Sequence, residues 1–265
     1  MALATGGPVT VKERAGARRR QAAEAYALPD LLLYCLRGHG AWIFWITVAM
    51  VLLLRFFLLA AALAPPVQQL LPLALSLGLA VLLLWSVPPE LARIVRATVA
   101  GRDELPDWGP LHDFGERQRE IMALLLAALV GFGPALLALR TLGCATSGRL
   151  APTCWTAAAV ALAVGVGLGS LGFGAFAMFE RVTLVLRVDL HVRLLATLGR
   201  RVGATAAGIG AGVVAALALG RLLGAVPWAG GVAQSVLLVW VVFTGGHAVG
   251  ALIRRSPATF EAIYG

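Results

Sequence analysis

The sequence predicts an all-α polytopic membrane protein: a helical bundle of six transmembrane helices, with both termini in the cytoplasm and interfacial amphipathic helices beside the spans. Of its 265 residues, 60% are hydrophobic and 13% are charged, whereas soluble domains carry about 25% charged residues. The apolar residues gather in runs as long as the roughly 20 residues that cross a hydrocarbon core. The basic residues flank these runs unequally, as they do in inner-membrane proteins.

Six apolar runs are long enough to be spans. Pro65 and Pro66 separate the first two runs, and the short turn 224–227 separates the last two. The stretch 28–36 is apolar but too short to cross, which is typical of an interfacial helix. We expect the spans at 41–64, 67–87, 121–139, 154–179, 202–223 and 228–252.

The basic residues predict the orientation. Eighteen of the 22 lie in the N-terminal tail, the loops 88–120 and 180–201 and the C-terminal tail, and three lie in connections on the other side. Because cytoplasmic loops carry the excess of Arg and Lys, this bias predicts a bacterial inner-membrane protein with both termini cytoplasmic. Residues 1–27 are then a disordered basic tail, 28–253 the membrane domain and 254–265 a short cytoplasmic tail.

Both long loops contain amphipathic stretches. In 89–100 the apolar residues follow a helical spacing. From 182 to 194 they mostly alternate, which is a strand period, but an isolated strand at a membrane surface leaves its backbone unpaired, so we expect a helix. Asp189, His191 and Arg193 lie in this second stretch, and we interpret them as solvated or headgroup-facing charge.

The loop between the second and third spans carries the segment Gly-Arg-Asp-Glu-Leu-Pro-Asp-Trp-Gly-Pro-Leu. This segment resembles the bacterial and archaeal membrane family catalogued as domain of unknown function 4013. The resemblance covers about residues 28–250 and implies a multi-span helical protein with no known activity. In the family a few residues often separate the Leu-Pro and Asp-Trp-Gly elements, which are fused here. The matching residues are Gly101, Leu105, Pro106, Asp107, Trp108, Gly109, Leu111 and Gly115, with Leu36, Arg37 and Gly38 before the first span.

The same segment has the properties of a rigid turn. Two prolines restrict φ, and Gly109 permits a positive φ. Trp108 is amphipathic, as residues at the headgroup level are. The turn either pins an interfacial helix or docks a partner protein, and both interpretations stay open.

Two cysteines lie in or beside the connection 140–153, at Cys144 and Cys154. The predicted orientation puts both in the oxidising compartment, so we predict a disulfide that closes this connection. The alternative is two unpaired thiols at the span ends. Since no His lies nearby, a zinc site is not expected.

Arg55 is the basic residue placed deepest in a predicted span, and an Arg at the bilayer centre costs about 2.5–3.5 kcal/mol on insertion scales. Arg140 and Arg221 lie near the outer ends of spans, and Arg149 lies in an outer connection. This outer half contains four arginines and no Asp or Glu. Either each side chain extends separately to lipid phosphates, or together they form a basic pocket for an anionic lipid or amphiphile.

Small residues recur at every fourth position in several spans, which lets helix backbones approach closely. The longest series is in the fifth span and predicts a central packing helix or a homo-oligomer face. His247, in the sixth span, is interpreted as a packed, hydrogen-bonded side chain. The fifth-span series is Ala204, Gly208, Gly212, Ala216 and Gly220.

All thirteen acidic residues lie in predicted cytoplasmic segments or at their edges. Ion-coupled transporters usually need a carboxylate near the midplane, so coupled transport is not expected. Because the chain also lacks phosphate-loop, hydrolase and metalloprotease motifs, we expect no catalytic residue, metal or cofactor. The expected function is a non-enzymatic scaffold, accessory subunit or lipid-binding protein, with membrane lipids, a homo-oligomer or a larger membrane complex as partners and no nucleic acid. The alternative is an uncoupled transporter or channel component for a small or amphiphilic solute, including an anionic one.

Overall fold

The structure is a computed structural model that describes residues 33–38, 40–106, 114–141, 152–223 and 228–265. All regular elements in these residues are helical. Six helices in this described part of the chain are long and apolar enough to cross a membrane, which confirms the predicted number. They are α3 (Ala41–Leu63), α4 (Leu70–Val99), α5 (Phe114–Thr141), α6 (Pro152–Phe179), α8 (Arg200–Leu222) and α9 (Ala229–Arg255).

Shorter helices lie beside the long ones. The helix expected in 182–194 is confirmed, because two of these short helices cover that stretch. Gly199, with a φ of +50°, lets the chain turn directly from the second of them into α8. The short helices are η1 (Tyr34–Leu36), η2 (Pro66–Gln68), η3 (Val182–Leu186), α7 (Val188–Leu198) and α10 (Pro257–Tyr264).

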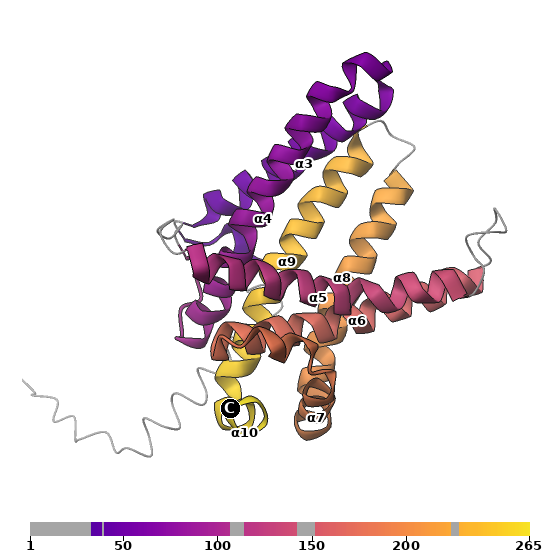
Figure 1. The fold of residues 1–265 in the computed structure, drawn as a ribbon. Coiled ribbons are helices and arrows are strands. Elements are labelled where there is room, and N and C mark those ends of the chain that lie inside the picture. Colours follow the sequence, from indigo (N-terminus) through magenta and orange to yellow (C-terminus); the bar gives the residue numbers. More distant parts are fainter. Residues whose placement is uncertain (1–32, 39, 107–113, 142–151, 224–227) are drawn as a thin grey trace, which may run out of the picture.

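The long helices form two groups (Figure 1). α3, α4, α8 and α9 run along a common direction, whereas α5 and α6 form a hairpin that crosses them. α6 meets α8 where Gly167 faces Ala206, and it meets α9 where Gly174 faces Val249. Both crossings lie nearer to the start of α8 and the end of α9 than to the opposite end of the four-helix group.

α4 extends beyond the predicted second span, 67–87. It continues through Pro88 and Pro89 to its last residue, so the amphipathic stretch 89–100 is the final part of the same helix rather than a separate loop element. This stretch is largely buried against the rest of the protein. The two prolines therefore do not end the helix here.

An arginine on α5 compensates for one of these prolines. Proline has no N–H, so within a helix it leaves the carbonyl four residues earlier without its usual donor. For Pro89 that carbonyl belongs to Trp85, and Arg117 Nη1 donates to it at 3.2 Å. The Arg117 guanidinium also lies 5.8 Å from the centre of the Trp85 ring. A side chain from the next long helix thus replaces the missing backbone bond.

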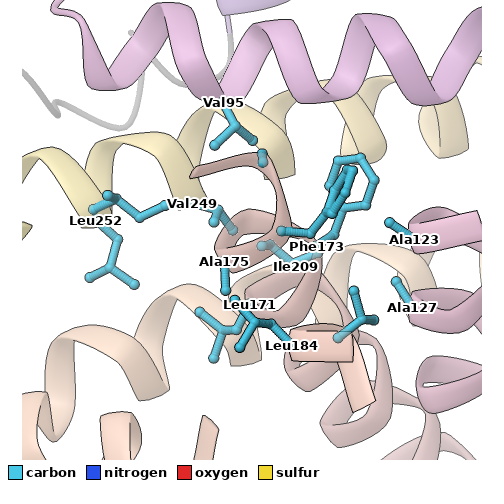
Figure 2. Close-up of a cluster of buried hydrophobic side chains, with 14 of the residues drawn as sticks. Val95, Ala123, Ala127, Leu171, Phe173, Ala175, Leu184, Ile209, Val249 and Leu252 are labelled. Carbon is cyan, nitrogen blue, oxygen red and sulfur yellow. The ribbon is translucent and has the colours of Figure 1, made fainter. Parts of the chain in front are cut away.

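The main hydrophobic core lies where α6 crosses its neighbours (Figure 2). Leu171, Phe173 and Ala175 of α6 lie among Val95, Ala123 and other side chains from the surrounding helices. In the most apolar segments of α9 and α6, 61% and 50% of the residues are buried, against 22% in α8. α9 and α6 are therefore packed more deeply than α8, the fifth span, for which the sequence predicted either a central packing helix or a homo-oligomer face.

α7 and α10 pack together at the end of the molecule where α8 begins (Figure 1). His191 of α7 is fully buried, which corrects its interpretation as solvated charge. Its Nε2 lies 3.2 Å from the Val185 carbonyl, which accepts only, so Nε2 carries the proton. The other ring nitrogen, Nδ1, then accepts the hydroxyl hydrogen of Tyr264 on α10 at 2.8 Å. The arrangement uses the neutral imidazole.

Docking of α10 is expected to weaken in acid. Burial lowers the pKa of His191 below its ordinary 6.5, so as the pH falls below about 6.5 the undocked state binds a proton more readily than the docked state. The stability of the docked state is therefore complete above pH 6.5 and declines below it. Hydrogen exchange of the α10 amides, corrected for intrinsic rates, should be faster at pH 5.5 than at 7.5. His191→Gln should remove the difference, and equal protection at both values in the unmodified protein would contradict the prediction.

Candidate functional site

Arg55 places a charged side chain within an apolar helix. It lies eight residues before the end of α3, which is about 12 Å along the helix. The side chain is exposed on the protein surface, at a depth where the helix length predicts hydrocarbon rather than water. A guanidinium in hydrocarbon is costly unless other groups bond its N–H donors.

Gln234 of α9 supplies one such group. Arg55 Nη1 donates to Gln234 Oε1 at 2.7 Å. Gln234 is the sixth residue of α9, which runs antiparallel to α3, so the two side chains meet at the same depth. Arg55 makes no other hydrogen bond or ion pair with the described residues. Its remaining donors stay available to a ligand in the groove described below.

Two glycines make room for this pair. A Cβ on Gly231 of α9 would lie 3.1 Å from Arg55 Nε and 3.3 Å from its Cζ, so the guanidinium lies against bare backbone. A Cβ on Gly220 of α8 would lie 2.7 Å from the Gln234 side-chain carbonyl carbon. Three helices therefore contribute to one polar contact, and its close geometry depends on both glycines.

The pair opens into a groove that we call the Arg55 groove, of about 640 Å³ between α3 and the adjoining ends of α8 and α9. Arg55 is its charged residue, and Phe56 and Trp228 stand at its side with ring centres 6.3 Å apart. Aliphatic residues of α3 line the rest, including Leu52 and Leu59. A cation in an otherwise apolar groove, beside an indole, fits an anionic headgroup whose chains lie along the helices.

The four arginines predicted as one basic pocket do not all gather here. Arg221 follows Gly220 at the end of α8, beside the Arg55 groove. Arg140 lies near the last residue of α5, and the α5–α6 hairpin extends sideways from the four-helix group (Figure 1). The site therefore contains Arg55 with Arg221 nearby, and Arg140 belongs to another part of the surface.

Several predicted residues lie outside the described part of the chain. They include Arg149, Cys144 and the side chain of Cys154, so the disulfide stays a prediction. Asp107, Trp108 and Gly109 of the loop motif are also outside.

The described half of the loop motif packs on the segment before α3. Leu105 is buried, and a Cβ on Gly40 would collide with the backbone carbonyls of Leu105 and Pro106. Gly38 has a φ of +76°, and a Cβ there would lie 3.0 Å from the Glu104 side chain. Gly101, with a φ of +89°, begins the turn. The two sequence elements that carry the family resemblance, more than 60 positions apart, are thus neighbours in space.

The fifth-span series of small residues divides between two environments. Gly212, Ala216 and Gly220 pack inward, with Gly212 against Val241 of α9. Ala204 is exposed, and a Cβ on Gly208 would meet open space. The first part of the series is therefore exposed on the described surface, and its role as a homo-oligomer face stays a prediction.

His247 is a packed, hydrogen-bonded side chain, as predicted. It is buried, and its Nδ1 lies 2.9 Å from Thr98 Oγ1 on α4. The Tyr34 ring stacks on the imidazole with centres 4.0 Å apart. These contacts tie η1 and α4 to α9.

A second polar cluster joins α4, α5 and α6. Arg96 lies at its centre, with its Nη1 at 3.1 Å from Glu116 and 3.5 Å from Glu120, and its Nη2 at 3.7 Å from Glu180. Its Nε donates to the Ala177 carbonyl at 2.9 Å. The Glu120 side chain is only 4% exposed. The cluster is a structural joint between the hairpin and the four-helix group, and sequence reasoning had treated its members as loop charges.

Among the described residues, no group of three or more His, Cys, Asp or Glu is placed to hold a metal ion. No family model, curated protein or solved structure matches the chain. The resemblance to the family of unknown function therefore stays a prediction that rests on the loop motif and on the N-terminal segment beside it.

Proposed function

We propose that this protein is a non-enzymatic, lipid-binding scaffold or accessory subunit of a bacterial inner membrane. In this proposal both termini, α7 and α10 are cytoplasmic, and the Arg55 groove opens in the outer leaflet. The arginine bias between the two sides supports this orientation. The single observation that carries the lipid-binding role is Arg55, held by Gln234 in an otherwise apolar groove.

The interior of the helix crossing favours this role over that of a solute transporter. A cavity of about 190 Å³ lies where α4, α5, α6, α8 and α9 meet, and its lining is almost wholly apolar. Its one hydroxyl, that of Ser170, donates to the Val166 carbonyl of its own helix at 2.8 Å. Such a lining offers no polar surface to a hydrated solute, whereas it suits a helix joint surrounded by lipid.

Removing the Arg55 charge is expected to weaken binding of anionic lipid by about tenfold or more, since a hydrogen bond to a charged group contributes about 1.5–3 kcal/mol. The experiment compares Arg55→Gln with the unmodified protein, delipidated in mild detergent and titrated with phosphatidylglycerol. Native mass spectrometry measures the bound fraction. Phosphatidylcholine, which carries no net charge, serves as the comparison lipid.

Arg140→Gln is the matched control, because it removes the same charge from an exposed position on the α5–α6 hairpin. Its phosphatidylglycerol binding should stay within about twofold of the unmodified protein. Equal losses in both variants would show diffuse attraction to basic charge instead of a site. Unchanged binding in Arg55→Gln would remove the observation on which the proposed function depends.

A further inference from the structure

The apolar cavity at the helix crossing, which we call the crossing cavity, lies deep in the spans. Two of its lining residues, Ile209 and Val213, are the tenth and fourteenth of the 23 residues of α8. A third, Val241, is the thirteenth of the 27 residues of α9. Both helices are long and apolar enough to cross a membrane. The cavity therefore lies near the middle of two spans, at the depth of the lipid acyl chains.

The crossing cavity is partly open to the surface of the protein. Its inner lining includes buried residues such as Val95 and Phe173, which Figure 2 shows in the core. Toward the surface it is lined by Phe132 of α5, which is 45% exposed, and by Val242 of α9, which is half-buried. Its opening is thus bordered by apolar side chains of apolar helices, where the surroundings are hydrocarbon.

The chemistry of the lining favours hydrocarbon as the occupant. None of the described residues that line the cavity is charged, and the Ser170 hydroxyl already donates to a carbonyl of its own helix. A buried water molecule needs about two to four polar partners, so this lining does not hold water. A hollow that stays unfilled deprives its walls of dispersion contacts, which is costly. Hydrocarbon restores these contacts without requiring a polar partner.

The volume of the cavity suits part of a chain. An apolar cavity of about 150 Å³ takes up a benzene molecule, which has six carbons. The crossing cavity, at about 190 Å³, has room for a chain segment of about that many carbons or slightly more. This is the length of a chain end and not of a whole lipid.

We propose that the crossing cavity binds the end of an acyl chain from a phospholipid of the surrounding bilayer. The headgroup stays at the membrane surface, because the lining offers no partner to a phosphate or a carboxylate. Binding is therefore independent of headgroup charge, unlike binding at the Arg55 groove. The two sites share no lining residue, so this inference requires the chain to lie in a membrane but does not rest on Arg55.

The test uses the full chain in phosphatidylcholine vesicles that contain a trace of phosphatidylcholine with a diazirine near the methyl end of one acyl chain. After illumination, peptide mass spectrometry locates the adducts. We expect adducts on Ile209 and Val213, which are 9% and 6% exposed and which a chain lying on the protein surface would not reach. Phosphatidylglycerol with the same label should give the same yield there within about twofold, because the lining is uncharged. Adducts confined to exposed residues of α8, such as Ala211, would overturn the proposal.

Ala128→Leu, in the part of the lining that α5 supplies, reduces the space for the chain and should lower the adduct yield at Val213 by about fivefold or more. Ala211→Leu is the matched control, because it makes the same change on the exposed face of α8, outside the lining, and should alter that yield by less than about twofold. Val213→Ala enlarges the cavity and should raise the yield at Ile209. Equal effects of the two leucine substitutions, or a lower yield in Val213→Ala, would overturn the proposal.

The source of the chain is tested with free palmitate that carries the same diazirine. Adducts on Ile209 from palmitate but not from phosphatidylcholine would overturn the proposal, since the occupant would then be a free fatty acid. Arg55→Gln should leave the adducts from phosphatidylcholine unchanged, because Arg55 does not line the crossing cavity. Failure of this inference is therefore separable from failure of the proposed function, which the loss of phosphatidylglycerol binding in the same variant tests.

Discussion

Gly210→Val is expected to force α8 away from α6 and to lower the free energy of unfolding by about 3 kcal/mol, the upper end of the usual cost of overpacking. A Cβ at Gly210 would lie 2.6 Å from both the carbonyl carbon and the Cα of Ala163 on α6. Backbone atoms cannot rotate aside as a side chain can, so the two helices must separate along their crossing. Thermal unfolding in detergent should show a midpoint lower by roughly 6–10 °C.

Gly208→Val is the control, two residues away in the same helix. A Cβ at Gly208 meets nothing within 4 Å, so the substitution carries the same change in helix propensity without the collision. Its unfolding midpoint should stay within about 2 °C of the unmodified protein, since surface substitutions usually change stability by at most about 0.5 kcal/mol. Equal destabilisation by the two substitutions would mean that α6 does not cross α8 at this point.

From the sequence, Gly208 was expected to lie at a helix–helix contact and Gly210 was not, which is the reverse of what the structure shows. Gly208 belongs to the regular series in the fifth span, and Gly210 does not. In a helix this rich in Ala and Gly, small residues occupy several faces at once, and the spacing alone cannot say which face meets a partner. The buried face of α8 is the one that α6 crosses, near Gly210. The position of this crossing could not be predicted from the local pattern of α8.

The long helices themselves were predictable because span length and composition are local properties. The end of the second one was not, because Pro88 and Pro89 usually end a helix. It continues because Arg117, 32 positions beyond Trp85, donates to the Trp85 carbonyl. Likewise, the spacing of apolar residues predicts a helix but not its orientation relative to the other helices. The crossing of the α5–α6 hairpin over the other helices could therefore not be predicted from the sequence.

The Arg55 site was predictable in part. Arg55 stood out because a charge inside a span is costly, but its partner Gln234 is 179 positions away. The sequence did contain one indication of the pairing, because Arg55 and Gln234 lie at a similar distance from the same end of two antiparallel spans. That indication identifies Gln234 as the partner only if α3 is already known to pack against α9. The two helices are not consecutive spans, so this packing could not be assumed.

Arg96→Gln is expected to loosen the joint between the hairpin and the four-helix group. Removing one partner of a buried ion pair costs about 3–5 kcal/mol, because the other charge is left buried without compensation. Glu120 is buried, but the Arg96 side chain is 31% exposed and water offsets part of the loss, so we expect about 2–3 kcal/mol. Arg102→Gln, at an exposed arginine that forms no ion pair with the described residues, should change the unfolding midpoint by less than about 2 °C.

The origin of this loss can be separated from a loss of packing by a second substitution. Glu120→Gln in the Arg96→Gln protein replaces the uncompensated carboxylate with a neutral amide of the same shape, so it should recover about 1 kcal/mol or more. In the unmodified background the same substitution removes a favourable contact with Arg96 and should not stabilise the protein. The sign of the Glu120→Gln effect should therefore reverse between the two backgrounds. If the sign of the Glu120→Gln effect is the same in both backgrounds, Arg96 stabilises the protein through its hydrocarbon stem and its hydrogen bond to Ala177. The carboxylates around Arg96 would then not contribute to holding the hairpin to the four-helix group.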